Sequence, residues 1–342
     1  MTAPLRLRLD GSALVSNWRW LARMSGSAAC GAAIKADGYG LGARPVLERL
    51  AAAGCRDFFL TTWDEVAALG AVPDGVSLSV LHGVRDEDMV TALASPARPT
   101  LNTVEQVKRW RDAGGGLCDV MADTGMNRLG LAVQDVAGGL LDGLEIDTLM
   151  SHLASADEDV PQNAHQREAF AALAGKTSAR RMSLANSAGI CLGSDYHFDL
   201  TRPGAALYGG IPRTEAGGHV RQVAFPEAQI IQRRMIAAGE SVGYNATFIA
   251  DQPMELAILN IGYADGYLRG FSNSGSAGGG CFPVIGRVSM DLIAIGVDAE
   301  PELGEGDWVT LDYDLPEAAV QSSLSQYELL TALGGRFERV WV

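Results

Sequence analysis

The chain has 342 residues, of which 47 % are hydrophobic, and its formal net charge is −14. This acidic balance leaves no basic stripe for a phosphate backbone, so we expect no nucleic-acid partner. Five scattered cysteines without CxxC spacing indicate neither a zinc site nor a disulfide framework, and they stand at Cys30, Cys55, Cys118, Cys191 and Cys281. With no targeting segment or membrane-length apolar run, we expect a soluble cytoplasmic protein with no membrane partner.

The order of predicted elements divides the chain into two parts. Alternation in LRLRL at 5–9 predicts a strand, and 11–24 reads as a helix. Eight further short apolar runs are predicted strands, at 30–34, 57–61, 77–82, 98–101, 118–122, 147–153, 181–185 and 197–202. Eight strands separated by segments long enough for helices favour a closed (β/α)8 TIM-like barrel of the α/β class, and a doubly wound open sheet is the alternative.

After about residue 220 the pattern changes. Short β-prone pieces such as MELAILNIGYA and DWVTLDY are separated by turn clusters, with little helical patterning before about residue 324. These pieces predict a mostly antiparallel β domain. We assign 10–221 to the barrel, and 222–342 together with the strand at 1–9 to the β domain.

Polar residues cluster just after the predicted barrel strands, where barrels of this kind build active sites. They are Lys35, Arg128, His152, Asn186, Ser187, Arg202 and Gly204. A lysine after a strand is most often solvated, and NSAG at 186–189 can be an ordinary helix N-cap. However, the small neighbours of Lys35 would let a ring approach, and a desolvated amine is what imine formation needs.

A helix start after the seventh strand and a glycine after the eighth are where barrels bind phosphate. An imine-forming lysine near such a phosphate pocket, without a metal-binding cluster, favours pyridoxal phosphate as the cofactor.

A family resemblance rests on nine motifs in order: IKADGYG, DTGMNRLG, HLASADE, ANSAG, TRPGAALYGG, VGYNATF, IGYADGY, GRVSMD and SQYELLTALGGR. Together they resemble alanine racemase, a pyridoxal-phosphate isomerase with an N-terminal α/β barrel and a C-terminal β domain. The resemblance covers nearly the whole chain. It implies pyridoxal 5′-phosphate as cofactor, alanine as substrate and a homodimer whose active site is shared between subunits.

The resemblance also implies a role for each matching residue. Lys35 would hold the cofactor covalently and serve one face of the α-carbon, while Tyr244 would serve the other face from the partner subunit. Arg202 would face the pyridine nitrogen and bond to His152; because arginine keeps its proton, the ring would stay a weak electron sink, which suits a racemase. The other implied contacts are to the cofactor by Tyr39, His152, Asn186, Ser187, Gly204, Ala205 and Tyr327, to the substrate by Arg128 and Met290, and at the pocket entrance by Tyr263, Asp265 and Ser289.

Two positions depart from the family pattern. Many members carry a lysine, often carbamylated, seven residues before the arginine of DTGMNRLG, and Met121 stands there instead. We therefore expect another acceptor or an anion such as chloride beside Arg128. Ser289 replaces a cysteine in GRVSMD, so the pocket could admit serine as well as alanine.

Alternative functions follow from these departures. A broader-specificity or serine racemase would use the same fold, since a pocket discriminates one methylene by only about 1–3 kcal/mol. A fold-related decarboxylase conflicts with Arg202, and a non-catalytic pyridoxal-phosphate carrier conflicts with the β domain and Tyr244. D-alanine biosynthesis for cell-wall peptidoglycan and alanine catabolism need the same chemistry, so the site residues do not separate them.

Overall fold

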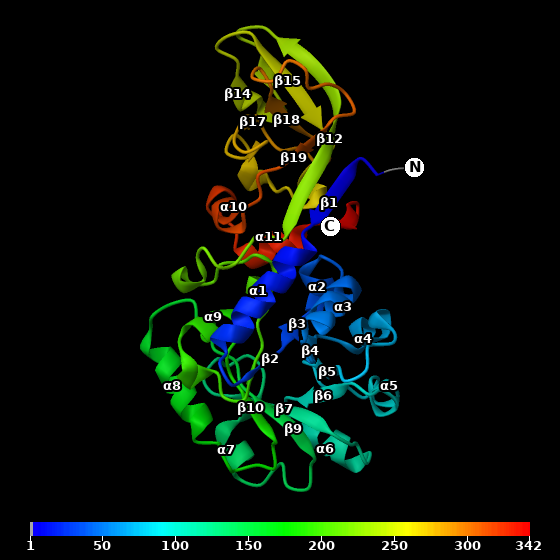
Figure 1. Ribbon diagram of the computed structural model, residues 1–342, viewed down its shortest axis with the longest axis vertical. Coiled ribbons are helices and arrows are strands. Elements are labelled where there is room, and N and C mark those ends of the chain that lie inside the picture. The colour runs from blue at the N-terminus through cyan, green and yellow to red at the C-terminus, as the bar shows by residue number, and fades with distance from the viewer. Residues whose placement is uncertain (1–2) are drawn as a thin grey trace.

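The first strand and helix form where the sequence predicts them, in a computed structural model that describes residues 3–342 (Figure 1). In β1 (Leu5–Leu9) the three leucines are buried while the two arginines are partly exposed. Asp10 then starts α1 (Gly11–Met24), because its carboxylate accepts the N–H of Ala13 at 2.8 Å. The helix lies along the barrel below the β domain in Figure 1.

The predicted barrel is present, and its strands are parallel. They are β2 (Ala29–Cys30), β3 (Ala32–Ala33), β4 (Asp57–Leu60), β5 (Ser77–Val80), β6 (Arg98–Leu101), β7 (Cys118–Asp123), β9 (Ile146–Met150), β10 (Arg181–Ser183) and β11 (Leu200–Thr201), with β8 (Leu131–Ala132) paired to β7. The hydrogen-bonded order runs β10-β9-β7-β6-β5-β4-β3, and β11 pairs with β2. Backbone hydrogen bonds from Asp199 and Arg202 to the β10 segment complete the ring, so the open-sheet alternative is wrong.

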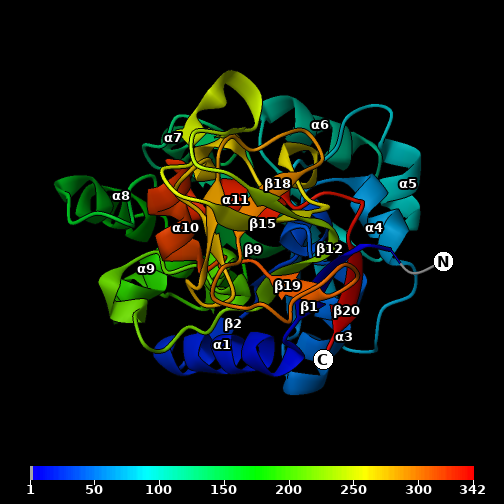
Figure 2. The ribbon, with the colours of Figure 1, turned by 90° about the horizontal axis from the view of Figure 1, so that it is seen from above.

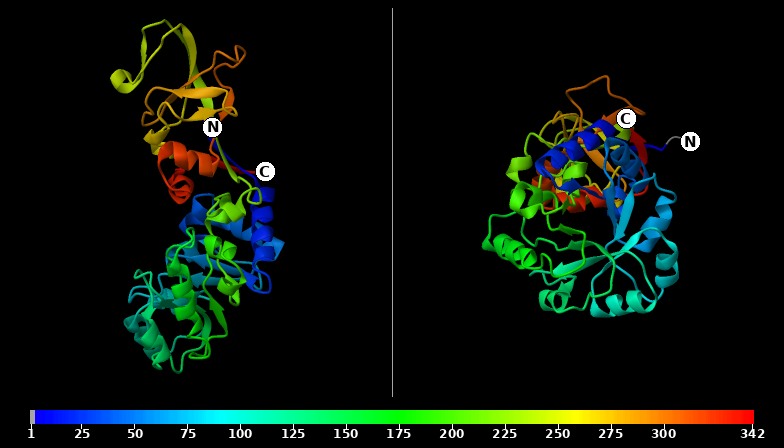
Figure 3. Two further views of the ribbon diagram at one scale, coloured as in Figure 1. Left: turned by 90° about the vertical axis from the view of Figure 1, so that its left-hand side faces the viewer. Right: turned by 60° about the horizontal axis from the view of Figure 1, so that its bottom comes forward.

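Helices surround this ring when the molecule is seen from above or from its lower end (Figures 2 and 3). They are α2 (Lys35–Tyr39), α3 (Ala43–Ala53), α4 (Trp63–Leu69), α5 (Met89–Ala94), α6 (Val104–Asp112), α7 (Val133–Ala137), α8 (Pro161–Ala171) and α9 (Ser187–Cys191). The strand expected at 197–202 is shorter than predicted, because a 3-10 turn occupies Ser194–Tyr196 and Phe198 has a positive φ of 52°. No helix in residues 3–342 is long and apolar enough to cross a membrane.

The C-terminal part is a mostly antiparallel sheet, as predicted. Its strands are β12 (Ala224–Ile236), β13 (Ser241–Val242), β14 (Phe248–Ile249), β15 (Met254–Leu259), β16 (Ser276–Ala277), β17 (Phe282–Ile285), β18 (Ile293–Gly296), β19 (Trp308–Thr310) and β20 (Glu338–Trp341). The main sheet has the order β16-β17-β18-β15-β12-β1-β20, in which β1 and β20 are parallel, and β13 and β14 form a separate hairpin.

The prediction that helical structure is nearly absent before about residue 324 is wrong. Helix α10 (Leu315–Ser322) precedes α11 (Gln326–Ala332). The start of α10 follows from local residues: Asp314 caps the helix and proline occupies its first turn, where a missing N–H costs nothing. Both helices lie between the sheet and the barrel (Figure 1).

An ion network closes the amino-terminal end of the barrel. Arg181 donates two hydrogen bonds to Asp57, at 2.8 and 3.0 Å, and one to Asp147 at 2.6 Å. Arg98 lies between Asp147 and the fully buried Asp119, at 3.3 and 3.4 Å. Burial raises the pKa of Asp147, but the hydrogen bond from Arg181 and the charge of Arg98 produce a net lowering.

Replacing Arg181 with glutamine should destabilise the fold, because the largely buried Asp57 loses its guanidinium partner and Asp147 keeps only Arg98. We expect urea titration at neutral pH to show a free energy of unfolding lower by about 3 kcal/mol. The difference should shrink at about pH 3, because the lowered pKa of Asp147 contributes stability that is lost as pH falls below the ordinary value of 3.8. Arg167→Gln, which breaks an exposed pair with Asp195, is the control and should cost less than about 1 kcal/mol; equal losses in both variants would contradict this role.

Candidate active site

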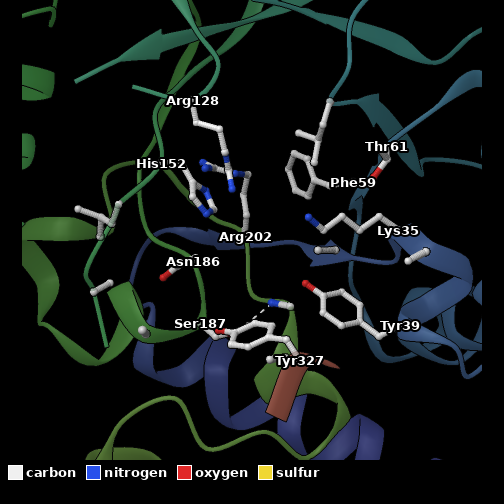
Figure 4. A pocket seen from close by; sticks show the side chains of 18 of the residues that line it. Lys35, Tyr39, Phe59, Thr61, Arg128, His152, Asn186, Ser187, Arg202 and Tyr327 are labelled. Carbon is white, nitrogen blue, oxygen red and sulfur yellow. Dashed lines mark hydrogen bonds between the residues drawn. The ribbon is translucent and has the colours of Figure 1, made fainter. Parts of the chain in front are cut away.

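A cavity of about 860 Å³ opens at the carboxyl ends of the barrel strands. Ten residues that the sequence singles out line it together: Lys35, Tyr39, Arg128, His152, Asn186, Ser187, Arg202, Gly204, Ala205 and Tyr327. The first nine come from the barrel, and Tyr327 comes from α11 of the C-terminal part. Figure 4 shows the Lys35 side chain pointing into the space between Phe59, Arg202 and Tyr39.

The turn that follows Lys35 is left-handed. Ala36, Asp37, Gly38 and Tyr39 all have positive φ between 52° and 64°, a conformation that costs roughly 1–2 kcal/mol per non-glycine residue. Side chains hold it in place: Glu65 accepts the N–H of Ala36 at 2.7 Å, and Asp37 accepts the N–H of Ala43 at 2.8 Å. The fold therefore stabilises a strained turn that fixes where the lysine begins.

Arg202 is a buried cation held by neutral groups. It donates to the Ser183 hydroxyl and, at 2.6 Å, to the Ser151 carbonyl, and its guanidinium lies 5.9 Å from the centre of the Phe59 ring. Within residues 3–342 it has no carboxylate at ion-pair distance. Burial lowers the pKa of Arg202 to about 10, so it remains charged at neutral pH.

His152 stands beside Arg202 on the cavity wall (Figure 4). Desolvation, together with the charges of Arg202, Arg128 and Lys35, lowers its pKa to about 3, so the imidazole is neutral near pH 7. The hydrogen bond expected between His152 and Arg202 is not formed among the described residues. The His152 backbone carbonyl instead accepts from Gln166 at 2.9 Å.

The Lys35 amine is desolvated and lies near one other cation, Arg128. Burial lowers its pKa, the Arg128 guanidinium lowers it further, and Glu65 opposes both. Lys35 makes no ion pair with any residue in the described part of the chain. A larger share of the neutral, nucleophilic amine therefore exists at a given pH than for a solvated lysine.

The other end of the cavity is lined by hydrogen-bond donors. The Ser187 hydroxyl accepts the N–H groups of Gly204 and Ala206, at 2.8 and 3.3 Å, which packs α9 against the chain after β11. A Cβ at position 204 would lie 2.2 Å from the Tyr39 hydroxyl, so only glycine fits this surface. Asn186 caps α9 through the N–H of Gly189 at 2.8 Å, in the ordinary way that the sequence also allowed. A phosphate fits this donor set, and an aldehyde fits the amine of Lys35.

Five predicted residues lie outside the cavity within one chain, and Tyr263 is one of them. Tyr244, between β13 and β14, is 65 % exposed, and Met290 is 53 % exposed. Ser289 lines a separate cavity of about 200 Å³ in the C-terminal sheet. Asp265 is 1 % exposed and forms an ion pair with Arg336.

Tyr263, the remaining predicted entrance residue, is partly buried below the guanidinium of Arg269, at 4.8 Å from the ring centre.

Met121 is buried on β7 and lines the cavity. Arg128 is exposed and has no hydrogen bond or ion pair with any of residues 3–342. The anion or acceptor expected beside it stays a prediction.

Sequence reasoning missed the residues that support the site. Glu65 belongs to a capping box with Thr62, a pattern that T-W-D-E signals directly, and it also holds the turn after Lys35. Ser183 supports Arg202 from inside the barrel, and its inward-facing place on β10 is the available signal. Arg202 also contacts the backbone carbonyl of Ser151, and no pattern of side chains in the sequence predicts such a contact.

Comparison with known proteins decides the family. Residues 9–212 match the N-terminal domain of alanine racemase, and residues 223–341 match its C-terminal domain. The chain belongs to the alanine racemase family. An alanine racemase of Acidiphilium cryptum is 42 % identical over 98 % of both chains, and a catabolic alanine racemase of Agrobacterium fabrum is 39 % identical over 98 % of this chain and 92 % of that protein.

The structures agree with the sequences. The crystal structure of alanine racemase from Bartonella henselae, which contains covalently bound pyridoxal phosphate, superposes over the whole of both chains with a TM-score of 0.92 and 34 % identity. Membership of the alanine racemase family makes this protein an isomerase. The match over both domains disfavours the single-barrel carrier alternative.

The electrostatics of Lys35 can be measured directly. We expect competitive acylation of its amine, followed by mass spectrometry over a series of pH values, to give a pKa below that of Nα-acetyl-lysine added as the reference. Hydroxylamine treatment beforehand removes any bound carbonyl compound. A pKa equal to or above the reference would contradict the desolvated environment.

Proposed function

We propose that this alanine racemase-family enzyme interconverts L-alanine and D-alanine with pyridoxal 5′-phosphate, using Lys35 on one face of the α-carbon and Tyr244 of the partner subunit on the other. The observation that carries the proposal is the Lys35 amine. It is desolvated, its pKa is lowered, and it points into the cavity whose far end is lined by Ser187, Gly204 and Tyr39.

The residues present fit this cofactor. Ser187, Gly204, Ala205, Tyr39 and Tyr327 would hold its phosphate, and Lys35 and Arg202 would hold its aldehyde carbon and ring nitrogen. When bound, the cofactor supplies an electron sink for the charge left on the α-carbon. Asn186 and His152 line the same wall and would contact the ring.

Arg202 limits that sink. Its pKa of about 10 keeps it protonated, so it offers a hydrogen bond to the ring nitrogen but no proton. Ser183 and Ser151 fix the guanidinium, so it does not reorient during a turnover. A weak sink favours return of a proton to the α-carbon over competing bond cleavages.

The groups that we assign to substrate binding have no hydrogen-bond partner within residues 3–342 of the single chain. The Arg128 guanidinium is exposed and unpaired among residues 3–342, which suits it to hold a substrate carboxylate. Met290 of the partner subunit would add its backbone N–H to the same carboxylate. Neutral His152 adds no charge to compete for it.

The two bases differ in origin. Lys35 accepts or returns a proton through its ε-amine, for which a lowered pKa is favourable near neutral pH. Tyr244 is 65 % exposed at the end of the β13–β14 hairpin, away from its own cavity. A homodimer that buries this side chain against the partner's cavity would deliver the phenol oxygen to the second face.

Proton NMR in heavy water tests the two-base proposal. With pyridoxal phosphate and L-alanine, the enzyme should exchange the α-proton for deuterium and form D-alanine. Lys35→Ala and Tyr244→Phe should each lower the rate of D-alanine formation by at least about 100-fold, the usual contribution of a general base. Formation of D-alanine at the wild-type rate by Tyr244→Phe would contradict the role of this tyrosine as the second base.

Mixed dimers test whether the site is shared. Lys35→Ala and Tyr244→Phe should each be nearly inactive as homodimers, but a mixed dimer would contain one site with both bases intact. Refolding an equal mixture should restore about a quarter of the wild-type activity, because half of the dimers pair the two variants and each has one working site. The matched control mixes Lys35→Ala with a Lys35→Ala, Tyr244→Phe double variant, which offers no intact site and should recover no activity. Absence of recovery in the test mixture would contradict a shared site.

A further inference from the structure

Arg336 connects two turns of the C-terminal part. It lies between α11 and β20, and its side chain is half exposed. The Nε atom is 2.6 Å from Oδ1 of the buried Asp265, and another guanidinium nitrogen donates to Oδ1 of the exposed Asp291 at 2.8 Å. One planar side chain therefore bridges two carboxylates, one inside the protein and one at its surface.

The first of these carboxylates supports a turn that packs on Met290. The N–H of Tyr263 donates to the Ser289 carbonyl and that of Ala264 to the Met290 carbonyl, both at 3.0 Å. A Cβ on Gly262 would lie 2.4 Å from the Met290 carbonyl oxygen, so the two turns meet without space for a side chain. The Met290 carbonyl is thus fixed, while its N–H has no acceptor among residues 3–342.

Asp265 also connects its turn to the segment that follows α11. Its own carbonyl accepts the N–H of Gly334 at 3.1 Å, just after α11. A Cβ on Gly266 would lie 2.4 Å from the Ala332 carbonyl oxygen, at the end of that helix. Helix α11 carries Tyr327, which lines the cavity of its own chain.

We propose that Arg336 is a positioning residue for substrate binding: by holding Asp265 and Asp291 together, it aims the N–H of Met290 at the substrate carboxylate in the partner's cavity. This inference rests on the proposed function, which assigns Met290 to the partner's site. Because α11 packs on the same turn, the arginine also connects the Met290 turn to the helix that carries Tyr327 into the cavity of the same chain.

The chemistry of arginine explains why this residue type stands there. A buried carboxylate such as Asp265 is costly unless a cation pairs with it. The guanidinium presents several N–H donors in a fixed plane, so it pairs with the buried and the exposed carboxylate at the same time. A lysine has a single ammonium group and would hold one partner well and the other poorly.

Steady-state kinetics of the full-length enzyme with bound cofactor test this inference. For Arg336→Gln we expect the KM for L-alanine to rise about 10-fold while kcat changes less than about 3-fold, as when one hydrogen bond to a charged group is weakened equally in ground and transition states. Arg336→Lys should lie between the glutamine variant and wild type.

Two inhibitors separate positioning from general damage. Acetate offers a carboxylate without an amine, and isopropylamine offers the amine without a carboxylate. In Arg336→Gln, the inhibition constant of acetate should rise with KM, while that of isopropylamine should stay unchanged. Asp291→Asn, which leaves the buried pair with Asp265 intact, should move the same constants in the same direction even if the arginine variants fold poorly.

The matched control is Arg85→Gln. Arg85 makes two side-chain hydrogen bonds to the carboxylate of Asp88 on the barrel surface. Its replacement should leave all constants unchanged. Equal weakening of acetate and isopropylamine, or unchanged constants in the Arg336 and Asp291 variants, would overturn the positioning role while wild-type racemisation continues. Failure of the wild type to racemise alanine would instead overturn the proposed function, and this inference with it.

Discussion

Unequal charge pairing at the two ends of the barrel is the constraint on which the site depends. At the amino-terminal end, Asp57, Asp119 and Asp147 are matched with Arg98 and Arg181, which leaves one more carboxylate than guanidinium. At the carboxyl end, Arg202 and Lys35 are desolvated without a paired carboxylate among the described residues. The field of Asp119 raises the pKa of Arg202 against the effect of burial, so the closed end of the barrel supports the cation at the open end.

An unpaired cation inside a protein costs free energy, and the fold uses neutral dipoles to lower that cost. The hydroxyl of Ser183 and the carbonyl of Ser151 hold Arg202 without neutralising it. The left-handed turn after Lys35 is a second cost, stabilised by Glu65 and Asp37. Both costs leave the cavity ready for a bound group that carries negative charge, which is the group that an alanine racemase needs.

The C-terminal part places its predicted site residues in two different environments. Helix α11 brings Tyr327 to the cavity of its own chain, whereas Tyr244 and Met290 are exposed elsewhere on the same chain. Arg336 and Asp265 lie between these two sets. In the dimer proposed above, the domain would serve its own barrel and a neighbouring one through turns that Arg336 connects.

The sequence by itself determined most of the element order and the set of ten site residues that meet at one cavity. Period-two leucines, short apolar runs and strand-end polar residues respond to local chemistry, and Lys35, Arg128, His152 and Arg202 do line one cavity. The nine ordered motifs indicated the family.

Tertiary structure alone decided the contacts that depend on distant backbone. The barrel closes through Asp199 and Arg202, which no local pattern encodes. The expected His152–Arg202 bond is replaced by contacts of Arg202 with Ser183 and a carbonyl, and α10 forms before residue 324, where little helix was predicted. Arg336 ends the motif SQYELLTALGGR, but the motif gave it no role, because the two carboxylates that it contacts lie 71 and 45 positions away in sequence. Such contacts arise only when packing brings distant segments together, so local residue preferences cannot specify them.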